Sequence, residues 1–138
     1  GQEREIVLRT TGRPGAEPPK VLEAAEVLDL QETILDVPVP DHVLDAILQT
    51  VGATRPNAPL ADDFVKRYVA WGAGPRASQT MTRAVKALAL LRGQAAASLE
   101  EVRTILKPVL RHRIIPNYTA TGEGVTVDQI IDRLDARL

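Results

Sequence analysis

Cysteine is absent from the 138 residues of this chain, and aromatic residues make up only 3% of them. Without thiols the chain can form neither disulfide bonds nor thiolate-ligated metal sites, which is consistent with a reducing compartment. Surfaces that stack nucleic-acid bases or bind large sugars depend on aromatic rings, so we expect neither kind of ligand. The interior must instead be built from leucine, valine, isoleucine and alanine.

Neither sign of charge is in excess, and long apolar runs are missing. The 17 basic and 18 acidic residues give a formal net charge of −1, whereas a dedicated nucleic-acid-binding domain usually carries a basic excess. No apolar run approaches the ~18 residues of a membrane span, and the charged residues at 1–5 lack the apolar core of a signal peptide. The sequence therefore predicts a cytoplasmic protein with no nucleic-acid partner and no membrane span.

Motifs of several well-known catalytic classes are also missing. The sequence has no G-x-x-x-x-G-K-[ST] phosphate-binding loop, no G-x-G-x-x-G fingerprint, no H-E-x-x-H and no nucleophile elbow. Its two histidines, His42 and His112, lie far apart, and neither belongs to a cluster with the spacing of metal ligands. We therefore expect neither a metal site nor catalytic residues within this chain.

Apolar residues at helical spacing dominate what is present, and they predict an all-α helical bundle forming one domain over residues 1–138. Stronger helices are expected at 41–51, 75–92, 98–109 and 126–138, and weaker ones at 2–9, 23–35 and 61–68. Residues 69–71 are either the end of a helix or a short strand, so the bundle has at most one very short β pairing. Loops are expected at 11–20, 54–60 and 117–124.

Local signals mark the ends of these helices. Asp41 is a candidate N-cap, residues 98–101 fit a capping box, and Thr126 is a candidate cap together with Gln129. Pro108 should kink or end its helix, because proline lacks the N–H group and clashes with the preceding turn. The core is expected to join one stripe of the 75–92 helix to the two helices that follow it. The stripe and its partners are Met81, Val85, Leu88 and Leu91, packed against Val102, Ile105, Leu106, Ile130, Ile131 and Leu134.

The most informative segment, at 68–77, reads Tyr-Val-Ala-Trp-Gly-Ala-Gly-Pro-Arg-Ala. Its two glycines allow a turn with close backbone approach, and Pro75 suits the first position of a helix. Arg76 then lies in the first turn, where a cation is mildly unfavourable because the positive helix end favours an anion. A phosphate or carboxylate shared between the guanidinium and the helix end would make this arginine favourable.

Further basic residues surround this segment. Arg83 and Lys86 lie on the same flank of the helix, away from the apolar stripe. The alternative interpretation is a solvated basic face behind a Gly-Pro helix start, and composition alone favours that alternative. The run at 111–113, Arg-His-Arg, lies where a helix should end, and its charge complements the negative helix terminus. A role for this run in docking another domain is secondary.

Taken in order, several segments resemble the C-terminal lid domain of AAA+ ATPases of the MoxR family. The two more specific runs are Gly-Ala-Gly-Pro-Arg-Ala at 72–77 and Val-Leu-Arg-His-Arg-Ile at 109–114. Weaker matches are Glu-Arg-Glu-Ile at 3–6, Leu-Gln at 30–31 ahead of Val-Pro-Val at 37–39, and Ala-Thr-Arg at 53–55. The segments follow the order of the family and cover nearly the whole chain.

The resemblance implies a nucleotide-binding role for Gly74, Pro75 and Arg76, because in this family the 72–77 run carries the second-sensor arginine that contacts the nucleotide phosphates. The family commonly has serine before the proline, where this chain has Gly74. Glycine is the poorer cap by a few tenths to ~1 kcal/mol, so we expect a looser helix start. Further candidates for the phosphate side or an interdomain face are Arg83, Arg111 and Arg113.

The resemblance also implies that the chain is part of a longer ATPase, whose Walker motifs lie upstream in an α/β domain. The lid would close over ATP bound by that domain and would not itself bind Mg²⁺. The fragment alone would not be an enzyme, whereas the parent would hydrolyse ATP. The implied partners are the AAA+ core, neighbouring subunits of a ring (a hexamer) and a protein with a von Willebrand factor A domain. Such ATPases act as chaperone-like remodellers that mature or activate partner complexes.

Two other functions remain open from the sequence. The first is a free-standing helical protein-interaction module without nucleotide chemistry. The second is a helix-turn-helix DNA binder that places Arg76, Arg83 and Lys86 in a groove of the duplex. The near-neutral net charge and the scarcity of Asn and Gln on that helix count against DNA binding. The residues encoded upstream of Gly1 would discriminate the lid from the free-standing module.

Overall fold

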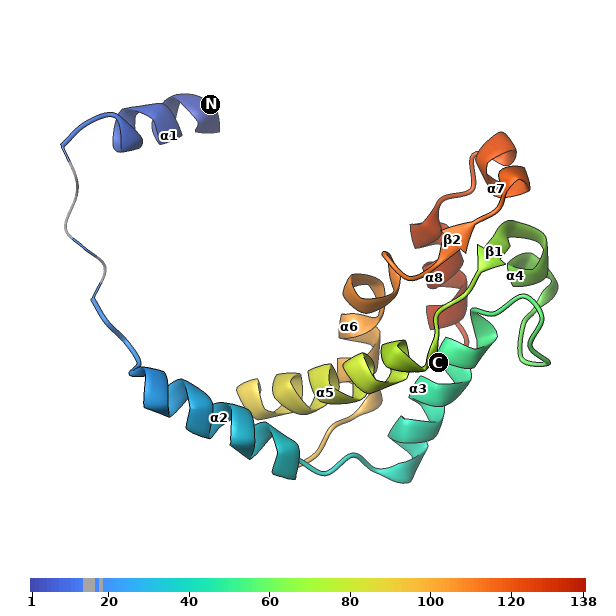
Figure 1. The fold of residues 1–138 in the computed structure, drawn as a ribbon, viewed down its shortest axis with the longest axis horizontal. Helices are drawn as coiled ribbons and strands as arrows, with labels where there is room; N and C mark the ends of the chain where they lie inside the picture. The colour runs from blue at the N-terminus through green and yellow to red at the C-terminus, as the bar shows by residue number, and fades with distance from the viewer. Residues whose placement is uncertain (14–16, 18) are drawn as a thin grey trace. The chain divides into compact units, whose positions relative to one another are not determined.

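The computed structural model describes residues 1–13, 17 and 19–138 (Figure 1). Within these residues it has eight helices and one two-stranded sheet, and the chain divides into two compact units, Gly1–Leu30 and Gln31–Leu138. The elements are α1 (Gln2–Thr10), α2 (Ala24–Asp36), α3 (Asp41–Ala53), α4 (Asp63–Tyr68), β1 (Val69–Trp71), α5 (Pro75–Leu91), α6 (Leu99–Leu110), β2 (Ile115–Pro116), α7 (Tyr118–Glu123) and α8 (Val127–Asp135). The all-α fold class with one very short β pairing is confirmed. Residues 14–16 and 18 of the expected loop at 11–20 lie outside the described residues.

The first unit contains α1 and most of α2. Helices are present where they were expected, although no described residue of α1 or α2 is buried. Arg9 and Glu5 form an exposed ion pair of 2.7 Å, one turn apart on α1. Such a pair stabilises a helix by only ~0.3–0.5 kcal/mol. Both helices keep apolar side chains in solvent, among them Leu8 and Leu28.

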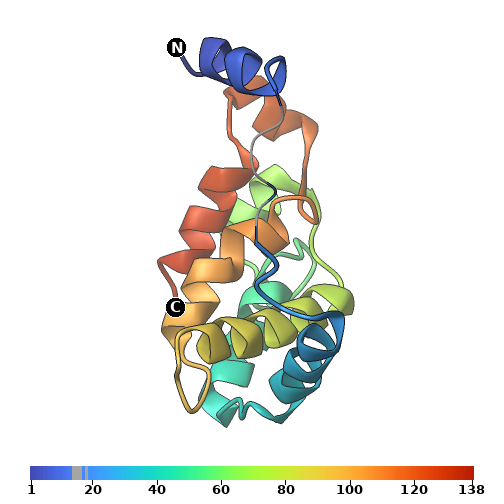
Figure 2. The same ribbon diagram turned by 90° about the vertical axis from the view of Figure 1, so that its left-hand side faces the viewer.

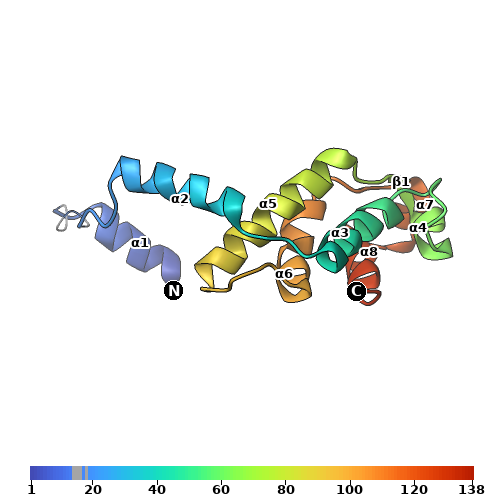
Figure 3. The ribbon, with the colours of Figure 1, turned by 90° about the horizontal axis from the view of Figure 1, so that it is seen from below.

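The second unit is a bundle built around α5. Helices α3 and α6 pack against α5, and α8 packs against α6 (Figures 1 and 2). Helix α3 also contacts α8, beside which it is seen in the view from below (Figure 3). Large side chains that are fully buried between these four helices include Ile47, Val51, Met81, Val85, Leu106, Leu110, Ile130, Ile131 and Leu134.

The buried face of α5 differs from the predicted stripe at its C-terminal end. The expected burial of Met81 and Val85 is confirmed, but Leu88 is partly exposed and Leu91 is 84% exposed. Ala89 takes the core position instead, so the buried residues recur every four positions. A small side chain at this position allows the end of α5 to approach α6 closely. On the partner helices the expected residues are buried, except that Ile105 is only partly so.

The capping signals were informative, with one correction, and of the two outcomes expected at Pro108 one is excluded. Both capping boxes are confirmed, at 98–101 on α6 and from Thr126 to Gln129 on α8. Asp41 is not the cap of α3, because Pro40 holds the N-cap position without a side-chain bond and Asp41 lies in the first turn. Pro108 does not end α6, which continues to Leu110. The buried side chains that follow this proline offset the lost hydrogen bond.

The expected loop at 117–124 was a wrong prediction, since it contains the short helix α7. The Asn117 side chain accepts a hydrogen bond from the Ala120 N–H at 3.0 Å and caps this helix. Gly124 ends it in the left-handed region at φ 71°. An asparagine followed seven residues later by a glycine is a helix signal of the same kind as those used elsewhere in the chain.

The small sheet brings two distant segments together. Strands β1 and β2 are antiparallel, with Val69 opposite Pro116 and Trp71 opposite Ile115. The Asn117 N–H extends this contact by donating to the Tyr68 carbonyl at 2.8 Å. The pairing holds the start of α5 near the segment that leaves α6.

Candidate functional site

The N-terminal end of α5 carries Arg76, on which the nucleotide-binding prediction depends. Gly74 is the N-cap in an extended conformation, and no described side chain caps this helix start. Pro75 is in the first turn, as expected, and the Ala77 N–H donates to the Gly74 carbonyl at 2.9 Å. The Arg76 side chain is exposed beside this end. A helix start without a side-chain cap is chemically suited to an anion.

Hydrogen bonds and a close backbone approach fix the segment that leads into α5. The buried Thr54 hydroxyl donates to the Val51 carbonyl at 2.6 Å and accepts from the Ala73 N–H at 2.8 Å. Arg55 Nε donates to the Ala73 carbonyl at 2.8 Å. A Cβ atom on Gly72 would lie 2.3 Å from the Thr54 carbonyl oxygen, so this position requires glycine. The Ala-Thr-Arg segment at 53–55 and the glycine-containing segment at 72–77, which are distant in the sequence, therefore form one support for the start of α5.

Beside this helix start lies a groove of about 360 Å³, here called the arginine groove. Its lining residues are Arg76, Gln79, Thr80, Arg83 and Arg113. The first four lie on α5, and the last lies on the segment between α6 and β2. Among the residues that the structure describes, no carboxylate and no apolar side chain lines the groove. The three guanidinium groups make it a concentrated positive site.

The position of Arg113 is held by contacts to two elements. Its Nη1 donates to the Val109 carbonyl at the end of α6, as expected for a cation at a helix C-terminus. Its Nη2 lies 3.5 Å from the Thr80 hydroxyl, which itself donates to the Arg76 carbonyl at 2.8 Å. The Nη1 atom is also in contact with Nε2 of His112. Thr80 therefore links the Arg113 guanidinium to the backbone of Arg76.

Two other predicted basic residues are placed elsewhere. Arg111 forms a two-pronged contact with Asp128, with Nε at 2.8 Å from Oδ1 and Nη2 at 3.0 Å from Oδ2. These hydrogen bonds raise the pKa of Arg111 and lower the pKa of Asp128. Lys86 Nζ donates to the Leu35 carbonyl at 2.6 Å, near the C-terminal end of α2. Both residues tie elements together, and neither lines the arginine groove.

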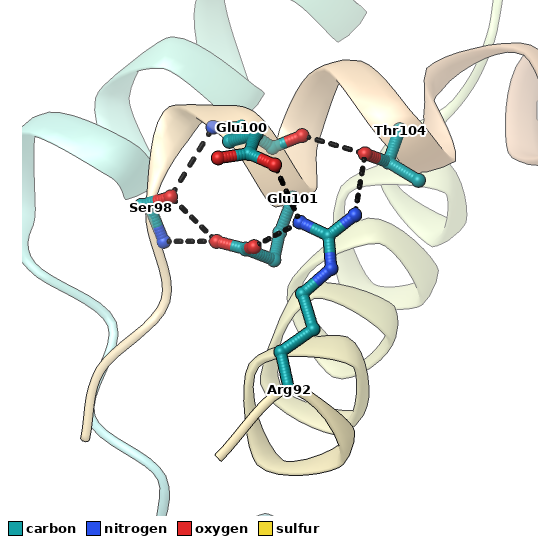
Figure 4. A network of polar contacts seen from close by, with 5 residues as sticks. All are labelled: Arg92, Ser98, Glu100, Glu101 and Thr104. Atoms are coloured by element: carbon teal, nitrogen blue, oxygen red, sulfur yellow. Dashed lines mark hydrogen bonds and ion pairs between the residues drawn. The ribbon is translucent and has the colours of Figure 1, made fainter. Parts of the chain in front are cut away.

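A polar network around the buried Glu101 joins the end of α5 to the start of α6 (Figure 4). Glu101 is fully buried and accepts hydrogen bonds from the Ser98 backbone and hydroxyl, while its other oxygen accepts from Arg92. Arg92 also contacts Glu100 and Thr104. Burial raises the pKa of Glu101, but the hydrogen bonds from Ser98 and Arg92 outweigh burial and place it below the ordinary value of 4.5. The capping box was predicted from the sequence, whereas its partner Arg92 was not.

A second hollow lies between α3 and the last residues of the chain. It has a volume of about 360 Å³ and a mixed lining that includes His42, Asp45, Arg137 and Leu138. Across the described ranges, no cluster of three or more His, Cys, Asp or Glu side chains could hold a metal ion. Among the helices described, none is both long enough and apolar enough to cross a membrane.

Comparison with known proteins gives consistent matches. The AAA lid domain family matches residues 62–134. Chaperone MoxR1 of Mycobacterium tuberculosis is 34% identical over 136 residues, which are 96% of this chain and 35% of that protein. Protein MoxR of Paracoccus denitrificans is 38% identical over 68 residues, which are 48% of this chain and 20% of that protein.

The fold has a close counterpart among solved structures. A crystal structure of a candidate ATPase from Cytophaga hutchinsonii superposes with a TM-score of 0.89 at 27% identity, covering 99% of this chain and 42% of that one. The chain spans about a third or less of the curated relatives that it matches, at 35% and 20% of their lengths. The range matched by the family contains all three arginines of the groove.

Proposed function

Because the chain belongs to the AAA lid domain family and is homologous to MoxR chaperones, we propose that residues 1–138 are the lid domain of a MoxR-type AAA+ ATPase. In this proposal the lid closes over ATP held by an α/β core domain that lies outside these residues. Arg76 is the second-sensor arginine and contacts the nucleotide phosphates. The observation that carries the proposal is the exposed Arg76 at the start of α5, where no described side chain caps the helix.

Phosphate suits this helix start for two physical reasons. The free N–H groups and the positive end of a helix favour an anion, and a guanidinium can bind two phosphate oxygens at once. Gly74 leaves the approach to the helix free of a side chain, and Pro75 fixes the first turn. Mg²⁺ prefers carboxylate and water oxygens, which this lining does not supply, so we assign Mg²⁺ to the core domain.

In this proposal Arg76 couples the nucleotide to the position of the lid. A ligand shifts a conformational equilibrium only when it makes different contacts in the two states. Contacts from Arg76 to phosphates held by the core exist only when the lid is closed. The support of α5 by Thr54 and Arg55 would transmit that movement to the bundle.

The parent protein is proposed to form a ring, a hexamer, in which the lid meets its own core and neighbouring subunits. Its work is proposed to be the chaperone-like maturation or activation of partner complexes, with a von Willebrand factor A domain protein among the partners. The name of the Mycobacterium tuberculosis relative, Chaperone MoxR1, supports this proposal. A cytoplasmic location, where ATP is supplied, follows from it.

The proposal is tested by replacing Arg76 in the full-length protein. Arg76→Ala should lower kcat for ATP hydrolysis about tenfold or more, a typical loss for one donor to a transferring group. Arg76→Lys should restore activity only in part, because an ammonium group does not form the guanidinium fork. The melting temperature should not change, since an exposed arginine in the first turn contributes little stability.

Arg103→Ala is the matched control for this experiment. Arg103 is exposed on α6, lies outside the groove and forms no ion pair among the described residues. Its loss removes the same charge and should leave kcat unchanged. Wild-type turnover in Arg76→Ala would contradict the proposed role of this arginine.

A further inference from the structure

We propose that Arg83 and Arg113 act together with Arg76 as one binding groove for a polyphosphate chain, such as that of a nucleoside triphosphate. The proposal rests on the proposed function for the role of Arg76. It adds two residues and a second chain segment to the phosphate contact. The groove would bind successive phosphate groups along its length instead of one phosphate at the helix start.

The first observation is the way arginines are paired in the second unit. Arginines that contact a carboxylate in the described residues from 31 to 138 are Arg67, Arg92, Arg111, Arg133 and Arg137. Arg55 instead donates to a backbone carbonyl. Five arginines of the same residues have no carboxylate contact: Arg55, Arg76, Arg83, Arg103 and Arg113. Three of these five, Arg76, Arg83 and Arg113, line the arginine groove. Most arginines without a carboxylate partner in this part of the chain therefore lie in one place.

The second observation is that, among the described residues, no carboxylate lines the groove to balance its three guanidinium groups. Arg113 is held toward the groove by its bonds to Val109 and its contact with Thr80. An anion with several charges would neutralise the three guanidinium groups at once, which makes their arrangement favourable.

The spacing along α5 suits an extended chain of anionic groups. Arg76, Thr80 and Arg83 are separated by four and three residues, so they lie on one face of the helix. At 1.5 Å of rise per residue, the two arginines are about 10 Å apart along the axis. Arg113 approaches the middle of this row, because its Nη2 lies 3.5 Å from the Thr80 hydroxyl. In this proposal, successive phosphate groups contact the three guanidinium groups along this row.

The lining favours a polyphosphate over an acidic peptide. The centre of a protein–protein interface is enriched in apolar and aromatic side chains, whereas the groove has only arginine, glutamine and threonine. The guanidinium fork matches the geometry of phosphate oxygens. A volume of about 360 Å³ accommodates a compact anion of high charge.

The test is the titration of this 138-residue chain with inorganic triphosphate at low ionic strength, followed by backbone amide chemical shifts and calorimetry. Arg83→Ala and Arg113→Ala should each weaken binding about tenfold, the size of one lost charge-assisted hydrogen bond. The control Arg103→Ala removes the same charge outside the groove and should change affinity less than about twofold. The exposed Arg83 side chain forms no hydrogen bond or ion pair among the described residues, so its replacement should test binding with little loss of stability.

Titrations with other anions identify the chemical class of the ligand. ATP and inorganic triphosphate should bind with similar affinity if the groove contacts only phosphates, and orthophosphate should bind more weakly than either. Tighter binding of a hexaglutamate peptide than of triphosphate, with the same dependence on the groove arginines, would overturn the polyphosphate assignment in favour of an acidic protein partner. Wild-type triphosphate affinity in both Arg83→Ala and Arg113→Ala would contradict the proposal that these two arginines bind the phosphate chain.

The design separates this inference from the proposed function. If Arg76→Ala abolishes triphosphate binding while Arg83→Ala and Arg113→Ala bind normally, the proposal for the groove is contradicted and the proposed function is not. If all three variants weaken triphosphate binding but Arg76→Ala keeps full turnover in the full-length ATPase, the proposed function fails and the groove stands. A melting curve of Arg113→Ala checks that losing the Val109 bond has not unfolded the chain.

Discussion

Two glycines precede α5 and differ in what a side chain would meet there. A Cβ atom on Gly72 would lie 2.3 Å from the Thr54 carbonyl oxygen and 2.7 Å from the Arg55 Cα atom. A Cβ atom on Gly74 would meet nothing within 4 Å. The first glycine therefore keeps two backbone segments in contact, whereas the second is an N-cap that tolerates a side chain.

Gly72→Ala should destabilise the isolated chain, because backbone atoms must move apart to admit the methyl group. We expect a loss of about 1–3 kcal/mol in the free energy of unfolding, as for other overpacked sites. Gly74→Ser is the control, and by adding a capping hydroxyl it should stabilise the chain by roughly a few tenths of a kcal/mol. Urea unfolding of both variants measures the difference. Equal midpoints for wild type and Gly72→Ala would show that the close approach is not required.

Single basic residues show how far the sequence can assign roles. The first-turn position of Arg76 was predicted correctly, since it depends only on its neighbours in the chain. The partners of Arg111 and Lys86 could not be predicted, because they lie 17 and 51 residues away in the chain. Arg113 and Thr80, 33 residues apart, likewise meet only through tertiary structure. Charge at a position is visible in the sequence, but the presence of a compensating partner is not.

The α5 helix shows the same limit for a whole element. From Met81, steps of three or four residues lead to Leu88 and Leu91, and steps of four lead to Val85 and Ala89. Both paths are compatible with a helix, and hydrophobicity alone favours the leucines. Packing against α6 selects the path with the small Ala89, and Leu91 is left 84% exposed.

The junction between α5 and α6 depends on a buried carboxylate. In the folded chain, the pKa of Glu101 lies below its ordinary value of 4.5. A carboxyl group whose pKa is lower in the folded chain than in the unfolded chain stabilises the fold. This stabilisation is fully present above the pKa of the unfolded chain and is lost as the pH falls through the pKa of the folded chain. Glu101 should therefore stabilise the junction at pH 7 and lose that effect below about pH 4.5.

Glu101→Gln tests this pH dependence. At pH 7 the variant should be less stable by about 1–3 kcal/mol, because Arg92 loses its charged partner. The difference from wild type should shrink as the pH falls below 4.5 and through the lower pKa of folded Glu101, where the wild-type side chain also becomes neutral. Glu123 and Asp128, whose pKa values are also lowered, titrate in both proteins and cancel in the comparison. Urea unfolding between pH 7 and pH 3 gives the measurement, and a difference that does not change with pH would contradict it.

At the scale of the whole molecule, the sequence predicted the bundle because its signals are local. Helical spacing and both capping boxes depend on residues within a few positions of one another. The single domain over 1–138 stays a prediction, and the structure has two compact units, Gly1–Leu30 and Gln31–Leu138. The arginine groove could not be predicted, since it needs the β1–β2 pairing to place the segment after α6 beside α5.

The whole chain should fold by itself but should not hydrolyse ATP. Phosphoryl transfer requires a cradle for the phosphates, a bound Mg²⁺ and a positioned water. The sequence has no phosphate-binding loop, and the arginine groove offers cations without a carboxylate to hold Mg²⁺. We therefore expect circular dichroism of the purified chain to show a helical protein, and a phosphate-release assay to show no turnover with Mg²⁺ and ATP. The full-length ATPase is the positive control, and triphosphate binding to the same sample shows that its groove is intact. Three arginines can stabilise the charge of a bound phosphate chain, but they do not activate a water molecule for its hydrolysis. Steady phosphate release by the purified chain would therefore contradict the assignment of ATP hydrolysis to another domain.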